Sequence, residues 1–129
     1  TKEIDELMER TNKDNVSLLF DTGHLVLSGE DPIDIFKRYE DRIKHIHFKD
    51  VRQDVKEAVD KECSCFLDGV KKGMFTVPGD GVIDFKPILD LIYKSDYSGW
   101  IVVEAEQDPA IANPFIYAKK AKEYIAQYQ

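Results

Sequence analysis

The sequence is poor in cysteine and in basic charge, and it has no long apolar run. Two of its 129 residues are cysteines, and 25 Asp and Glu outweigh 18 Lys and Arg to give a net charge of −7. Excess negative charge repels phosphate backbones, so we expect no nucleic-acid partner. No apolar stretch approaches the roughly 20 residues that a bilayer span needs, and no signal peptide is recognisable, so we also expect no membrane partner.

The two cysteines, Cys63 and Cys65, are separated by one residue. This spacing suits neither an ordinary disulfide nor a zinc knuckle without further ligands, although such a pair can bind soft metals. We expect two half-buried thiols in a reducing, cytoplasmic compartment.

Two common catalytic signatures are also missing. The turn at residues 78–81 lacks both the Lys-Ser/Thr of a phosphate-binding P-loop and the spacing of a dinucleotide fingerprint. Ser17, Ser28 and Ser98 lie in contexts unlike the turn that presents a catalytic serine. Neither nucleotide binding nor a serine nucleophile is indicated.

The sequence does contain an alternation of strand-like and helical segments. A helix is predicted over the first dozen residues, and strand-like runs follow at residues 16–20, 43–48 and 100–106. Further helices are predicted after the capping residues Asp31 and Asp84. A last helix is predicted to start near Asn113-Pro114 and to pack through Phe115, Ala118, Ala121, Ile125 and Tyr128. Strands separated by helices form parallel sheets, so we predict an α/β fold.

A long segment, residues 51–79, follows the second strand. Ordinary connections take about 2–6 residues, and this one has a charged, helical middle at residues 54–62. Long ordered loops at the edge of a sheet often serve function. We therefore expect residues 1–129 to form a single partial domain in which 51–79 is a lid over the active-site edge. The chain begins at Thr1 within a helical pattern, so we expect upstream sequence to be missing.

Each strand-like run ends in a side chain that can bind a metal: Asp21, His47 and Glu104. The carboxyl ends of parallel strands meet at one edge of the sheet, so these side chains are expected to converge there. Charges buried without a partner are costly, and a divalent cation would offset that cost. The pattern predicts a mixed nitrogen and oxygen metal site.

Each of these residues, taken alone, also suits a structural role. Asp21 could cap a helix or form a turn, because short acidic side chains favour both positions. His45 and His47 could be a hydrogen-bonded pair in the core, and Glu104 could pair with Lys49. Three such endings on three successive strands favour the metal site.

At these residues the chain resembles the xylose-isomerase-like TIM-barrel superfamily. The shared motifs are Asp-Thr-Gly-His at 21–24, His-Ile-His at 45–47 and the strand that ends at Glu104. Three longer motifs, at residues 66–70, 75–81 and 103–109, are similar to the inosose dehydratase family within it. The resemblance runs nearly end to end and implies the C-terminal three strand–helix units of a (β/α)8 TIM barrel.

The resemblance implies that the metal ligands are Asp21, His47 and Glu104, joined by a Glu from an earlier strand that this chain does not contain. The implied cofactor is a divalent metal, Mn²⁺ or Co²⁺, which suits oxygen and imidazole ligands. Proton handling would fall to His24 and Lys49, with Glu104 as a possible base.

Residues near the implied metal would contact the substrate: His24, Lys49, Asp50 and Arg52. The implied activity is that of a lyase that removes water from scyllo-inosose, a cyclic polyol ketone. A keto-sugar epimerase or isomerase remains an alternative, and so does a non-catalytic fragment that lacks one metal ligand. Endonuclease chemistry is disfavoured by the net charge of −7. Three strands leave open sheet edges, so we expect homo-oligomers or association with the missing N-terminal part.

Overall fold

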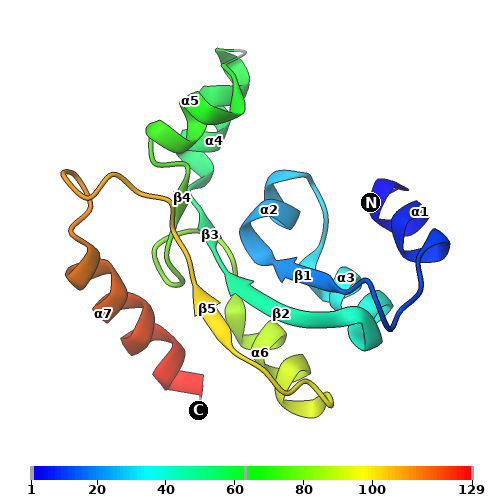
Figure 1. Cartoon of the computed structure of the whole chain (residues 1–129). Coiled ribbons are helices and arrows are strands. Elements are labelled where there is room, and N and C mark those ends of the chain that lie inside the picture. Colours follow the sequence, from blue (N-terminus) through cyan, green and yellow to red (C-terminus); the bar gives the residue numbers. More distant parts are fainter. Residues whose placement is uncertain (1, 63, 129) are drawn as a thin grey trace.

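A three-stranded parallel sheet organises the molecule, which is a computed structural model that describes residues 2–62 and 64–128. Its strands are β1 (Leu18–Asp21), β2 (Ile43–Phe48) and β5 (Ile101–Val103), in the order β1-β2-β5 (Figure 1). Both strand pairs are parallel, as predicted. The register places Asp21 opposite His47, and His47 opposite Val102.

Helices connect and flank these strands. They are α1 (Lys2–Arg10), α2 (Thr22–Leu27), α3 (Pro32–Tyr39), α6 (Phe85–Lys94) and α7 (Pro114–Ile125), with short 3₁₀ turns at Glu40–Arg42 and Ala126–Tyr128. The caps predicted at Asp31 and Asp84 are confirmed, because each side chain accepts a hydrogen bond from a first-turn backbone N–H. The last helix starts where it was predicted, and Asn113 caps it in the same way. Helix α2 was not expected, because its six residues are too few to show a helical period.

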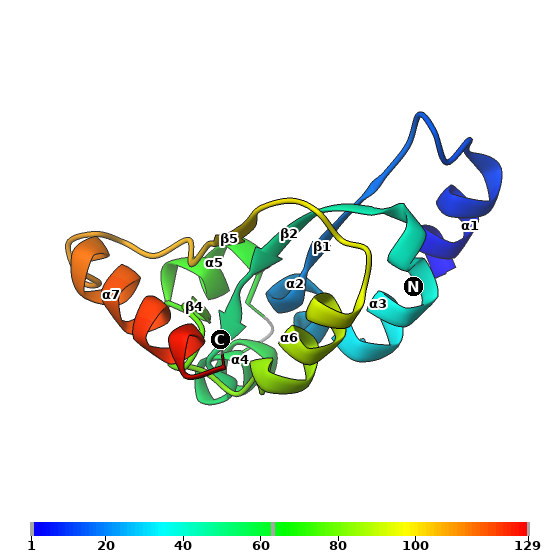
Figure 2. The same cartoon turned by 90° about the horizontal axis from the view of Figure 1, so that it is seen from below.

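The core lies on one face of the sheet. Phe20, Ile46 and Phe48 are at most 1% exposed and point toward the helices. The Phe20 ring meets Phe36 of α3 at 5.5 Å, and the Phe48 ring meets Phe85 of α6 at 4.9 Å. Figure 2 shows α2, α3 and α6 together on this side of the strands. Each such buried side chain stabilises the fold by roughly 1.5–3 kcal/mol.

The opposite face of the sheet carries the predicted site. Leu19 is 47% exposed and Val102 is 38% exposed, while His45 and His47 are partly buried between them. From His45 to Phe48 the side chains alternate, because Ile46 and Phe48 point into the core and the two histidines do not. Ile43 also lies in the core, so strict alternation does not extend to the start of β2. Within the described residues no helix covers this face of the sheet, and Leu19 and Val102 are exposed on it.

The segment 51–79 folds into a small unit of its own. It holds β3 (Asp50–Val51), α4 (Gln53–Lys61), α5 (Phe66–Lys71) and β4 (Phe75–Thr76), with β3 and β4 antiparallel. Helix α4 matches the predicted helical stretch 54–62, whereas α5 and the short strand pair were not predicted. Val51, Met74 and Phe75 are buried together and join this unit to α2 through Leu27.

Three expectations need correction. The third strand ends at Val103 instead of residue 106, because its partner β2 ends at Phe48, which is paired with Val103; the backbone of Glu106 then has a positive φ of 47°. Cys65 is exposed and not half-buried, since it precedes α5 at the surface; Cys63 lies outside the described residues. Phe115 of α7 is 78% exposed, because no described element covers that side of the helix.

The predicted packing face of α7 is confirmed in part. Ala121 is buried, and Ile125 and Tyr128 pack against the core, but Ala118 is exposed like Phe115.

In the described residues we find no helix with both the length and the apolar character needed to cross a bilayer.

Candidate metal centre

Asp21, His47 and Glu104 meet at the carboxyl edge of the sheet, as predicted. Each offers one ligand atom, and these three atoms all lie within 4.8 Å of one another. The His47 Nδ1 atom is 3.6 Å from Asp21 Oδ2 and 3.3 Å from Glu104 Oε2. The cluster joins the ends of three strands that are distant in sequence.

Asp21 belongs to the cluster and also caps a helix. It is the last residue of β1, and its Oδ1 accepts a hydrogen bond of 3.0 Å from the backbone N–H of His24 in α2. The other oxygen, Oδ2, faces His47. The helix cap and the place in the ligand cluster, both expected from the sequence, are therefore both realised, one on each oxygen.

The donor set fits a divalent cation. Two carboxylates and one imidazole are the ligands that Mn²⁺, Co²⁺ and Mg²⁺ accept, and no thiolate is present in the cluster. Asp21 is only 7% exposed, so its negative charge is largely removed from water. Two partly buried carboxylates facing one imidazole nitrogen need positive charge to offset their desolvation.

Lys49 supplies part of that positive charge. Its side chain is 0% exposed, and its Nζ lies 2.6 Å from Glu104 Oε2 and 3.4 Å from Asp21 Oδ2. Burial alone would lower the pKa of Lys49, but hydrogen bonds to Glu104 and Glu106, with the charge of Asp21, raise it above the ordinary value. Burial likewise works to raise the pKa of Glu104, but Lys49 and His47 hold it below its usual range. The Glu104–Lys49 pairing is therefore also present.

His24 lies beside Lys49 and is exposed on its other side. Its Nε2 is 3.2 Å from Lys49 Nζ, and the exposed fraction of its side chain is 47%. The imidazole ring meets the Phe75 ring edge-on at 5.0 Å and stacks on the Phe66 ring at 6.0 Å. Segment 51–79 thus contributes an aromatic wall next to the predicted site.

The sequence matches one family model along nearly its whole length. Residues 1–128 match the model described as xylose isomerase-like TIM barrel. The chain belongs to the xylose isomerase-like TIM barrel family. Its parallel sheet agrees with that family, in which strands alternate with helices around a barrel.

Curated relatives in this family carry a common name. An inosose dehydratase of Lacticaseibacillus casei is 70% identical over 125 residues, which is 97% of this chain and 42% of the relative. Inosose dehydratases of Clostridium beijerinckii and Geobacillus thermodenitrificans are 61% and 58% identical over 127 residues, which is 98% of this chain and 43% of each relative. The chain therefore spans less than half the length of these relatives.

Two residues predicted to bind substrate have other partners. The Asp50 carboxylate is 0% exposed and accepts hydrogen bonds from the backbone N–H groups of Val51, Gly81 and Ile83. Arg52 donates to Asp80 at 2.6 Å. These contacts favour structural roles, and the predicted substrate contacts of both residues stay predictions.

Arg52 also ties α7 to the 51–79 unit. Its guanidinium donates to the Gly73 carbonyl oxygen at 2.8 Å and to the Tyr117 hydroxyl at 3.2 Å.

Burial of Asp50 raises the pKa of its carboxyl, although the backbone N–H groups oppose that rise.

One residue of the site was not predicted. Glu106 contacts Lys49 Nζ through Oε1 and lies 3.7 Å from His24 Nε2. The only signal in the sequence is its position two residues after Glu104, on the same side of an ideal strand. Its backbone φ of 47°, which brings the carboxylate there, cannot be read from that spacing.

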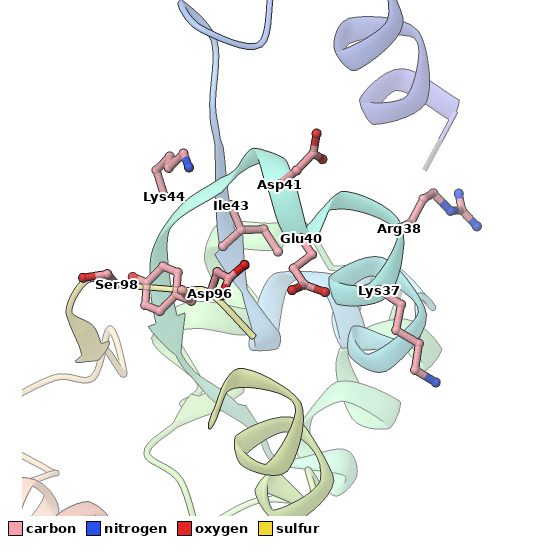
Figure 3. A pocket seen from close by; sticks show the side chains of 9 residues that line it. Lys37, Arg38, Glu40, Asp41, Ile43, Lys44, Asp96 and Ser98 are labelled. Atoms are coloured by element: carbon pink, nitrogen blue, oxygen red, sulfur yellow. The ribbon is translucent and has the colours of Figure 1, made fainter. Parts of the chain in front are cut away.

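A separate hollow lies at the opposite edge of the sheet, where β2 begins. It encloses about 480 Å³ and is lined mainly by charged side chains of both signs (Figure 3). None of the predicted site residues lines it. The family places its chemistry at the carboxyl edge, so this hollow is not the candidate site.

Proposed function

We propose that this chain carries the metal-binding edge of an inosose dehydratase. The reaction is the metal-dependent loss of water from scyllo-inosose (2-keto-myo-inositol), which gives a trihydroxycyclohexane dione. The observation that carries the proposal is the cluster of Asp21, His47 and Glu104 at the carboxyl edge of the sheet. The name of the relatives, inosose dehydratase, supports the substrate class.

Asp21, His47 and Glu104 would hold the cation, with Mn²⁺ or Co²⁺ suited to this ligand set. When bound, such a cation supplies Lewis-acid polarisation of the substrate's ketone oxygen. The aromatic rings of Phe66 and Phe75 would exclude water beside it, because they pack against His24 at the rim.

Water loss next to a ketone requires two proton movements. A base removes the proton from the carbon beside the carbonyl, the C–H electron pair forms the new double bond, and the β-hydroxyl leaves with a proton as water. Lys49 suits the donor role, because its side chain carries an ammonium group beside the ligand carboxylates, with Nζ 2.6 Å from Glu104 Oε2 and 3.4 Å from Asp21 Oδ2. His24, half-exposed and 3.2 Å from Lys49 Nζ, suits the acceptor role, with Glu104 as the alternative base.

A chimera with the Lacticaseibacillus casei relative tests the proposal. This chain replaces the 42% of that enzyme which it matches at 70% identity, and water loss from scyllo-inosose is followed with and without Mn²⁺. We expect metal-dependent turnover that a chelator removes. His47→Ala should reduce it to background, because the imidazole ligand of the cluster is lost.

A matched control uses the other histidine of the same strand and face. His45→Ala should retain Mn²⁺ binding, because His45 is outside the ligand cluster. Undiminished turnover of the His47→Ala chimera would contradict the ligand assignment. Exchange of a sugar epimer without loss of water would support the alternative epimerase or isomerase.

The open face of the sheet also bears on partners. Trp100 is 81% exposed, and Leu19 and Val102 are partly exposed on the sheet. We propose that this surface is covered in solution, by another copy of the chain or by the remaining part of a barrel. Light scattering of the isolated chain should give a mass above that of the 14.9 kDa monomer; a monomeric mass would argue against self-association.

A further inference from the structure

The backbone of Glu106 is unusual. Within residues 2–62 and 64–128 it is the one non-glycine residue with a positive φ, at 47°. A side chain in this left-handed region costs conformational energy, so the surrounding structure must favour it. The conformation follows Glu104 by two residues and directs the Glu106 carboxylate toward Lys49.

Lys49 creates an electrostatic conflict in the proposed metal centre. Its buried ammonium lies 2.6 Å from a Glu104 oxygen and 3.4 Å from an Asp21 oxygen, and both carboxylates are proposed metal ligands. An ammonium so placed neutralises ligand charge and repels a cation bound by the same oxygens. Asp21, Glu104, Lys49 and a dication together would carry one unbalanced positive charge.

Glu106 resolves this conflict. Its carboxylate contacts the same Nζ, yet Glu106 is not among the residues that can share a metal with His47. The added negative charge makes the group neutral with a dication in place. It also gives the ammonium a partner that the cation does not require.

We infer that Glu106 is the counter-ion of Lys49 and so leaves Asp21 and Glu104 available to a divalent cation. This inference rests on the proposed function, since it concerns the same metal centre. Glu106 is a positioning residue here: it acts on the metal through Lys49.

A double-mutant cycle tests this role through metal affinity. The variants are Glu106→Gln, Lys49→Met and the two combined, and Mn²⁺ binding is measured by calorimetry in the 129-residue chain and in the chimera. We expect Glu106→Gln to weaken Mn²⁺ binding by about tenfold or more. In the Lys49→Met background the same change should cost less than about threefold, because no ammonium remains to be neutralised.

The alternative is a general attraction between Glu106 and the cation. That attraction would give the same fold-loss in both backgrounds, and this result would overturn the inference. Glu123→Gln, an exposed carboxylate on α7, is the control and should not change Mn²⁺ binding. Circular dichroism establishes that each variant is folded.

Two further results separate the possible failures. If Glu106→Gln does not fold, Lys49→Met alone decides: the inference requires Mn²⁺ binding at least as tight as wild type, and weaker binding overturns it. If the wild-type chimera binds no Mn²⁺, the proposed metal centre falls and the inference with it. If the wild type binds and the cycle is additive, only the inference falls.

Discussion

The aliphatic stem of Lys49 lies directly across Gly23. A Cβ atom built at Gly23 would come within 2.6 Å of Lys49 Cγ and 2.9 Å of Lys49 Cβ. These are the atoms nearest the backbone of a fully buried side chain, so they have little freedom to move. The position of the Lys49 ammonium among the carboxylates therefore depends on residue 23 being a glycine, which has no side chain to displace it.

Gly23→Ala should destabilise the fold and displace Lys49. We expect a loss of about 1–3 kcal/mol in the free energy of unfolding, typical of an overpacked site, measured by urea denaturation. Gly29→Asn is the control: Gly29 has a φ of 80° and nothing within 4 Å of a built Cβ. Asn tolerates that backbone, so the control should change stability by less than about 0.5 kcal/mol. An unchanged Gly23→Ala variant would show that Lys49 can move freely.

The Thr22 hydroxyl fixes the backbone of Lys49 through two hydrogen bonds. It donates to the Lys49 carbonyl oxygen at 2.7 Å and accepts from the Lys49 N–H at 3.0 Å, and Thr22 is 0% exposed. Thr22→Val keeps the shape but leaves both buried backbone groups unpaired. We expect a loss of about 1–3 kcal/mol in unfolding free energy. Thr22→Ser keeps the hydroxyl and should lose clearly less; equal losses would contradict the hydrogen-bonding role.

The convergence of Asp21, His47 and Glu104 could be predicted from the sequence, because parallel strands deliver their carboxyl ends to one edge whatever lies between them. The caps at Asp31 and Asp84 were predictable for a similar reason, since each acts on its own next turn. Both rules depend on local pattern and strand direction alone.

The arrangement around Lys49 could not be predicted in this way. The position of Lys49, two residues after His47, puts both on one face of an ideal strand. The complete burial of Lys49 depends on Gly23, Thr22 and Phe75, which come from other elements. The contact with Glu106 depends on a left-handed backbone that no spacing rule contains. Helix α2 and the β3–β4 pair are similarly short elements that tertiary packing stabilises.

Asp80 should make the stability of the chain sensitive to acid. Burial alone would raise the pKa of Asp80, but hydrogen bonds from Lys120, Thr76 and Arg52 lower it below its ordinary value of 3.8. A carboxylate with a depressed folded pKa stabilises the protein above its unfolded pKa, and this contribution is lost as the pH falls through the folded pKa. Asp80→Asn should therefore cost about 1–3 kcal/mol at neutral pH.

The pH dependence of that difference is the decisive measurement. The gap in urea midpoint between wild type and Asp80→Asn should narrow well below pH 3.8, where both side chains are uncharged. Asp90→Asn, which breaks an exposed pair with Lys86, should leave the midpoint unchanged at either pH. A gap that stays constant with pH would mean that packing, and not charge, explains the role of Asp80.

Asp50 was predicted to contact the substrate, but its hydrogen bonds indicate a structural role that a substitution can test. Its Oδ1 accepts from the N–H groups of Val51 and Ile83 at 2.8 and 2.9 Å, and its Oδ2 accepts from Gly81 at 3.0 Å. Asp50→Asn turns one acceptor into an NH₂ group that faces a backbone donor. We expect a loss of about 1–3 kcal/mol in unfolding free energy.

The chimera separates the two roles of Asp50. If the role is structural, the Asp50→Asn chimera should lose urea stability while its KM for scyllo-inosose stays near that of the parent chimera at a temperature where both are folded. A large rise in KM with unchanged stability would instead support the direct substrate contact predicted from the sequence. Because the carboxylate is 0% exposed and accepts three backbone hydrogen bonds, the structural outcome is the expected one.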